Sequence, residues 1–131
     1  MKPQQTAPFP LATHLGMVTE VIDEGGARAR VEVTPEHLNP HGAVHGAVLF
    51  ALVDTAMGAA TLSVLASDQW CASIEVQLRF VRPVFSGQLM ARARVISAGK
   101  RIVHLSAEVR DDDDELVALA TGSFAVIPKP A

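Results

Sequence analysis

The stretch Asn39–Leu65, NPHGAVHGAVLFALVDTAMGAATLSVL, decides how the rest of this chain folds. It opens with a loop of small and polar residues, and from His45 it continues for about five or six helical turns without a proline. Its apolar residues do not keep to one stripe, because Val48–Val53 alone would cover the whole circumference of a helix. A helix that is apolar all round is a buried helix. We therefore expect a long central helix that begins near His45 and ends around residues 66–68.

One acidic residue, Asp54, lies in the middle of this apolar helix. A carboxylate that leaves water without partners costs several kcal/mol or shifts its pKa upward. Such an acid is kept either because neighbouring backbone or a second chain satisfies it, or because it takes part in chemistry. Asp54 is therefore the first candidate functional residue.

Alternation of apolar and polar residues predicts β-strands on both sides of the helix. The expected strands cover residues 16–23, 27–33, 71–82, 89–98, 102–110 and 116–127, with turn residues between them. In the strand at 71–82, strict alternation places Ile74 and Val76 on one face and Ser73 and Glu75 on the other. Two strands, a long helix and four strands indicate the α+β class, with a strongly bent antiparallel sheet wrapped around the helix.

The composition limits the number of domains and the kinds of partner. Residues 1–15, with three prolines, predict an irregular N-terminal arm, and residues 16–131 a single domain. The apolar fraction of 49% is high for a soluble chain, so one face is expected to be buried in a partner. The single cysteine, Cys71, favours a reducing, cytoplasmic setting. A formal charge of −3 without a basic run argues against nucleic acid, and the absence of an uninterrupted apolar span or an apolar leader argues against a membrane.

Several short motifs resemble those of hotdog-fold acyl-CoA thioesterases, in particular the phenylacetate-degradation type. That group has an Asn, a Gly three residues later, a His-Gly-Gly at the start of the helix and an acid followed by Thr-Ala. The matching residues here are Asn39, Gly42, His45-Gly46 and Asp54-Thr55-Ala56. The runs Leu78–Pro83 and Thr121–Phe124 also fit, and the resemblance extends from Gly16 onward. Ala47 departs from the pattern, since it replaces the second glycine. Its added methyl group would narrow the substrate channel if the pantetheine arm passes close to this position.

Thioester hydrolysis needs a donor for the developing oxyanion and an activated water or nucleophile. Gly46 at the helix start would supply the donor, because the first N–H groups of a helix have no internal acceptor. Close packing against the sheet is an equally good reason for a glycine there. Asp54 would act as base or nucleophile. Asn39 would hold the water or the thioester, or simply shape the loop, and His45 would orient the loop. The resemblance implies that the hydroxyl of Ser73, on the strand after the helix, assists the acid, although most serines on strands have no such role.

The spacing of Gly46 and Asp54 also predicts an assembly. Eight residues at ~1.5 Å rise separate them by roughly 12 Å along one helix. A carbonyl held at Gly46 therefore cannot also reach Asp54 of the same chain. Two antiparallel helices in a twofold dimer would let each chain lend its Asp54 to the other's Gly46. The resemblance implies the same homodimer with composite sites, and we expect dimers to pair into a homotetramer.

The resemblance implies a cytoplasmic acyl-CoA thioesterase that acts on an apolar acyl group, aryl or medium-chain, without a metal or a separate cofactor. Ala47 would line the channel for the coenzyme A arm. The cationic candidates for its phosphates are Arg79, Arg82, Lys100 and Arg101, each of which could equally be an ordinary surface charge.

Three alternative functions remain at this point. A non-catalytic module that binds or senses acyl-CoA would not need an acid at Asp54. A hydratase acting on enoyl-CoA would need an acid paired with His45 near the helix start. A purely structural dimerisation domain would leave the acid in the helix unexplained.

Overall fold

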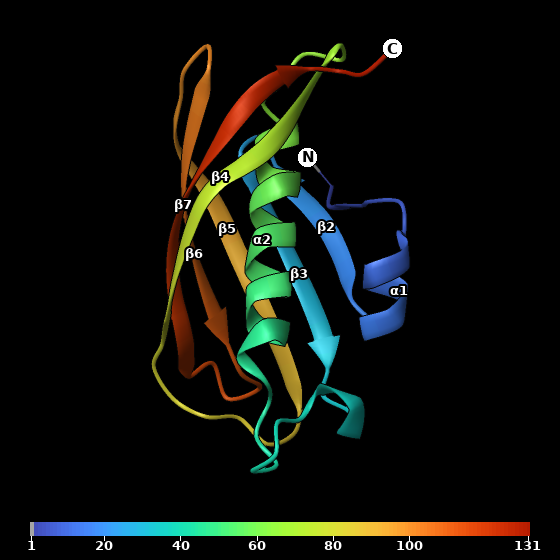
Figure 1. The fold of residues 1–131 in the computed structure, drawn as a ribbon, viewed down its shortest axis with the longest axis vertical. Helices are drawn as coiled ribbons and strands as arrows, with labels where there is room; N and C mark the ends of the chain where they lie inside the picture. Colours follow the sequence, from blue (N-terminus) through green and yellow to red (C-terminus); the bar gives the residue numbers. More distant parts are fainter. Residues whose placement is uncertain (1) are drawn as a thin grey trace.

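The computed structural model describes residues 2–131 and has the expected α+β architecture, a sheet curved around one long helix (Figure 1). Its elements are β1 (Gln4–Gln5), α1 (Pro10–Leu15), β2 (Val18–Asp23), β3 (Gly26–Glu32), a 3-10 turn (Pro35–His37), α2 (Gly46–Leu62), β4 (Gln69–Phe80), β5 (Gln88–Ala98), β6 (Ile102–Arg110) and β7 (Leu116–Pro128). The seven strands form one antiparallel sheet in the order β1-β2-β3-β5-β6-β7-β4, so β4 lies at an edge.

Helix α2 packs one side against the sheet. Leu52, Val53 and Met57 are fully buried there, on the side of the sheet where β5 and β6 bury Leu89, Ala91, Val103 and Leu105. The other side of α2 is not covered by its own chain: Phe50 is 42% exposed and Leu62 is 48% exposed. The expectation of a helix buried on all sides is therefore met on only half of its circumference within one chain.

Helix α2 ends earlier than the apolar pattern predicts, at Leu62 rather than at residues 66–68. The Ser63 hydroxyl donates a hydrogen bond to the carbonyl oxygen of Ala60 (2.6 Å) and accepts one from the N–H of Gly25 (2.8 Å). The next turn tightens, since Val64 N–H bonds to the carbonyl of Thr61 (3.0 Å). Ser63 thus ties the end of the helix to the β2–β3 turn.

The N-terminal arm is more regular than predicted. Strand β1 pairs with β2, and helix α1 has Pro10 in its first turn, where a missing N–H costs nothing. Gly16 ends α1 with a φ of 75°, a conformation that glycine adopts readily. Ala12 and Met17 are buried and attach the arm to the core.

Strict alternation fails in β4, where a bulge shifts the register between Ser73 and Glu75. A bulge inserts one residue and turns the residues before it to the other face. The prediction that Ser73 lies on the face opposite Val76 is therefore wrong: Val76 packs against the core, and Ser73 also faces the helix side of the sheet. Ile74, the inserted residue, is 58% exposed.

Candidate active site

The uncovered side of α2 forms the floor of a groove of about 1120 Å³. The N-terminal arm and β2 form one wall, and β4 with Phe124 forms the other. Most of the lining is apolar or small, and Asp54 is the single charged side chain among the described residues that line it. A carboxylate in an apolar groove is therefore the main chemical feature of this surface.

Asp54 lies half-buried in this groove, and its Oδ1 atom is buried without a hydrogen-bond partner among the described residues. Burial raises the pKa of Asp54 above its ordinary value of 3.8, and the Ser73 hydroxyl lowers it by less than burial raises it. A carboxylate that water and the protein solvate poorly is a stronger base than one on the surface. This burial and raised pKa are compatible with the role of base that the sequence analysis gives Asp54, a role that stays a prediction.

Cys71 lies in the same groove, with its Sγ atom 3.9 Å from the carbonyl oxygen of Gly58. Burial, and then the negative charge of Asp54, raise the pKa of the Cys71 thiol. The thiol therefore stays protonated and is a poor nucleophile. Sequence reasoning did not connect Cys71 with the site, although β4 carries it two residues before Ser73.

At the start of α2, His45 caps the helix: its Nδ1 atom accepts the N–H of Ala47 at 2.9 Å. A neutral ring that accepts at Nδ1 carries its proton on Nε2. The N–H of Gly46, as the first helical residue, has no acceptor within the helix. His45 thus organises the start of the helix and leaves the N–H of Gly46 without an acceptor in the helix.

Gly46 also has a packing reason to lack a side chain. A Cβ atom at this position would lie 2.9 Å from Cζ of the Phe80 ring, which is too close for any real contact. The close-packing explanation of Gly46 is therefore supported, and it does not conflict with a role for its N–H group. Sequence reasoning missed Phe80 because it comes from the far end of β4.

Asn39 shapes the loop before α2. Its side-chain oxygen accepts the N–H groups of His41 (2.9 Å) and Ala43 (3.2 Å), and its own N–H bonds to the carbonyl of Ala43 (2.7 Å). This is the turn role that was left open in the sequence. Asn39 does not line the groove of its own chain.

The structure therefore brings Asp54 and Ser73 together, with Ala47 on the same groove, and keeps Gly46 apart from them. Helix α2 runs without interruption from Gly46 past Asp54, so the separation of roughly 12 Å along the axis holds. A single chain does not bring the Gly46 donor and the Asp54 carboxylate to one carbonyl.

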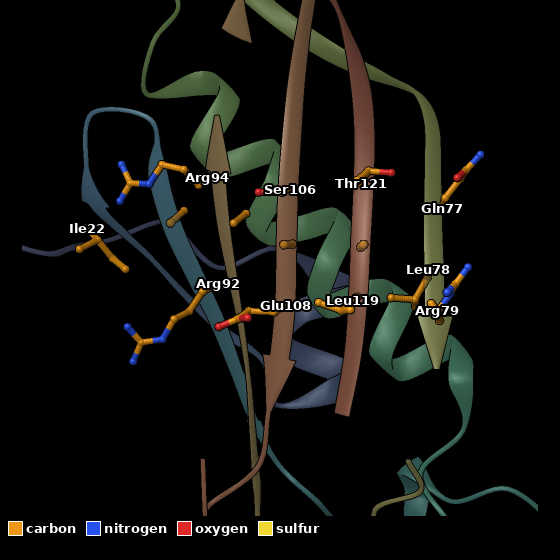
Figure 2. A pocket seen from close by; sticks show the side chains of 14 residues that line it. Ile22, Gln77, Leu78, Arg79, Arg92, Arg94, Ser106, Glu108, Leu119 and Thr121 are labelled. Carbon is orange, nitrogen blue, oxygen red and sulfur yellow. The ribbon is translucent and has the colours of Figure 1, made fainter. Parts of the chain in front are cut away.

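The four cationic candidates do not converge. Arg79 lies on the outer face of the sheet, beside a second cavity of about 850 Å³ that Arg92 and Arg94 also line, with α2 behind the sheet (Figure 2). Arg82 pairs with Glu115 at 3.4 Å, and Lys100 and Arg101 are exposed at the β5–β6 turn. Their contact with coenzyme A phosphates stays a prediction.

Within residues 2–131, no helix is long and apolar enough to cross a membrane. No group of three His, Cys, Asp or Glu side chains in that part of the chain could hold a metal ion.

Comparison with known proteins decides the family. The family model described as the thioesterase superfamily matches residues 41–118, which include α2 with Asp54 and the strands β4, β5 and β6. The chain belongs to the thioesterase superfamily. The predicted hotdog fold and the resemblance to thioesterases of that fold are confirmed, and with them the assignment to a family of thioester hydrolases.

This thioesterase-superfamily chain is similar to several known proteins over most of its length. The acyl-coenzyme A thioesterase PaaI of Escherichia coli is 36% identical over 113 residues, which are 85% of this chain and 78% of that protein. The solved structure of E. coli PaaI has a TM-score of 0.84 and covers 91% of this chain and 85% of that one, at 32% identity. A conserved protein of Pseudomonas aeruginosa has a TM-score of 0.87 at 32% identity and covers 92% of this chain and 95% of its own. A protein of Archaeoglobus fulgidus is 31% identical over 103 residues, 78% of this chain and 65% of that protein.

Proposed function

We propose that this chain is an acyl-CoA thioesterase that hydrolyses the thioester of an apolar acyl-CoA, aryl or medium-chain, to the free acid and coenzyme A. The observation that carries the proposal is the half-buried Asp54 carboxylate, whose Oδ1 has no hydrogen-bond partner among the described residues, in an apolar groove of a thioesterase-superfamily fold. The sequence similarity to E. coli PaaI, which is named as an acyl-coenzyme A thioesterase, supports coenzyme A esters as the substrates.

In the proposed mechanism, the thioester carbonyl oxygen accepts the N–H of Gly46 from one copy, while Asp54 comes from the other. Asp54 takes a proton from water as the water oxygen forms a bond to the carbonyl carbon. The Gly46 N–H and the positive end of the helix dipole stabilise the oxyanion that results. The carbon–sulfur bond then breaks, and the sulfur leaves with the proton held by Asp54. Attack by Asp54 itself, followed by hydrolysis of the anhydride, would use the same residues.

The mechanism requires a homodimer, and two features of the fold support one. The outer edge of β4 has no strand beside it within the chain, and edge strands normally need cover. Next to it, the uncovered side of α2 exposes apolar side chains such as Phe50. We further propose that dimers pair into a homotetramer and that the protein is cytoplasmic, in line with its single free cysteine. Sedimentation equilibrium measures the assembly directly.

The proposed function is tested by thiol release from phenylacetyl-, benzoyl-, hexanoyl- and decanoyl-CoA, with the wild type and Asp54→Asn. Wild type should hydrolyse at least one of them. Asp54→Asn should lower kcat/KM at least about a hundredfold, the equivalent of a ~3 kcal/mol transition-state contribution.

Two results would overturn the proposal. If wild type binds these ligands but hydrolyses none, the chain is a module that binds acyl-CoA without catalysis. If Asp54→Asn is as active as wild type, hydrolysis does not use the groove carboxylate.

A further inference from the structure

Gly58 stands in the interior of α2, where glycine makes a helix less stable than alanine does. Several other glycines of the chain have a clear steric reason, and two of them contact apolar side chains. A Cβ at Gly46 would lie 2.9 Å from the Phe80 ring, and one at Gly122 would lie 2.7 Å from the Met57 sulfur. A Cβ at Gly58 would meet only the Phe124 ring, at the ordinary contact distance of 3.8 Å. The fold of the single chain therefore does not require a glycine at position 58.

Gly58 follows Asp54 by four residues, so both lie on the same side of α2 about one turn apart. Both line the groove, together with Cys71 from β4 and Phe124 from β7. The missing side chain therefore leaves a hollow in the groove floor one turn from the proposed base. An acyl group whose carbonyl carbon is held at Asp54 would reach this hollow first.

The proposed dimer leaves this hollow outside the overlap of the two helices. If Gly46 of one copy lies beside Asp54 of the other, the antiparallel helices overlap between these two positions, with Phe50 near the twofold axis. The groove beyond Asp54, toward Leu62, then lies past the start of the other copy's helix. This part is lined by Gly58, Ala59, Leu62, Cys71 and Phe124, without a charged side chain among the described residues. It suits an apolar acyl group better than the phosphates of coenzyme A.

We propose that Gly58 is a specificity-determining residue whose missing side chain gives the acyl pocket the width for a ring-bearing acyl group. The inference rests on the proposed thioesterase function and assigns the acyl end of the substrate to the groove between Asp54 and Leu62. The ring would lie over Gly58, with Phe124 and Cys71 beside it. The coenzyme A part of the bound substrate would extend from Asp54 in the opposite direction, away from Gly58.

The test is Gly58→Ala, assayed with phenylacetyl-, hexanoyl- and acetyl-CoA as a series of decreasing acyl width and size. We expect kcat/KM for phenylacetyl-CoA to fall at least tenfold, while the value for acetyl-CoA stays within twofold of wild type. Inhibition by free coenzyme A should be unchanged, and the unfolding midpoint should not fall. Ser67→Thr adds the same single methyl group on an exposed turn outside the groove and should leave all three substrates unaffected.

Three results would overturn the proposal. An equal loss with all three substrates, or weaker inhibition by free coenzyme A, would place the coenzyme A arm over Gly58. A change in dimer dissociation with substrate preference intact would show that the glycine admits the second copy. If wild type hydrolyses none of the three substrates, the proposed function fails, and binding is measured in place of activity. Gly58→Ala must then weaken the binding of phenylacetyl-CoA at least tenfold more than it weakens the binding of free coenzyme A.

Discussion

Among single residues, Asp54 has the largest consequence for pH dependence. Burial raises its pKa above 3.8, and the proposed base works only as the carboxylate. Activity should therefore be present above the raised pKa and lost as the pH falls through it. We expect the acid limb of the kcat/KM profile to lie above the usual aspartate range, measured between pH 4 and 8 with wild type.

Ser73→Ala provides the matched variant for this profile, because the Ser73 hydroxyl lowers the pKa of Asp54. Removing the hydroxyl should move the acid limb of the kcat/KM profile to higher pH. The activity on the alkaline plateau should fall less than the activity on the acid limb. A limb that stays in place would show that the hydroxyl does not act on Asp54, and a limb at the ordinary value of 3.8 would place the titration on another group.

The burial of Asp54 also predicts that its ionised carboxylate lowers the stability of the fold at neutral pH. A carboxyl group whose folded pKa is raised binds protons more tightly in the folded state, so stability is greatest at low pH and falls as the pH rises through the window from 3.8 to the raised pKa. Asp54→Asn cannot ionise and should unfold at higher urea concentration than wild type at pH 7. The difference should shrink toward pH 4. Equal midpoints at pH 7 would mean that the carboxylate is well solvated in the assembled protein.

The residues of the site differ in how well the sequence reveals them. Asp54 stands out because a lone acid in an apolar helix is costly and therefore informative. Ser73 was identified from the resemblance, but period-two alternation placed it on the wrong face, since a bulge cannot be read from apolar spacing alone. The contact between Gly46 and Phe80 joins residues far apart in the chain, and no local pattern marks it.

At the scale of secondary-structure elements, the start of α2 and the end of β4 fit each other through Gly46 and Phe80. A methyl group at position 46 would lie 2.9 Å from the tip of the Phe80 ring, so the ring has to shift and Gly46→Ala should destabilise the fold by about 1 kcal/mol. Phe80 is 57% exposed and can be shortened at little cost. Phe80→Leu combined with Gly46→Ala should therefore regain most of the lost stability, measured by urea unfolding.

Thiol release by this double variant separates the two reasons for the glycine. Because the added methyl group points at residue 80, activity should return together with stability. If stability returns and activity does not, the missing side chain also makes room for the thioester. If Phe80→Leu does not restore stability, another neighbouring group restricts the space for a side chain at position 46.

The elements themselves were predictable where periodicity is strong. The succession along the chain of two strands, the long helix and four strands follows from alternation and from the apolar run, and the structure confirms it for β2 to β7 and α2. The short strand β1 was not predicted. The end of α2 at Leu62 depends on the Ser63 hydroxyl meeting the Gly25 N–H, a tertiary contact. Helix α1 was missed because three prolines in the arm suggested irregular chain, although proline is accepted in a first helical turn.

At the scale of the whole molecule, the central question is whether one catalytic site draws on two copies. Two variants, each defective in one half of the proposed site, can answer it. Asp54→Asn removes the base. Gly46→Pro removes the N–H donor; proline suits the first helical position, and His45 before it already has the extended conformation that proline requires, with φ −64° and ψ 138°. The proline variant is made with Phe80→Leu, so that its ring has space.

Each variant alone should be inactive, because every site in its homodimer lacks one partner. After unfolding and refolding as an equal mixture, half of the dimers should contain one chain of each kind, and each of these has one intact site out of two. The mixture should therefore recover about a quarter of wild-type activity. Phe80→Leu with Gly46→Ala, mixed in the same way with wild type, controls for refolding losses. If Asp54 and Gly46 acted within one chain, the mixture would stay as inactive as its components, since each chain would still carry its own defect.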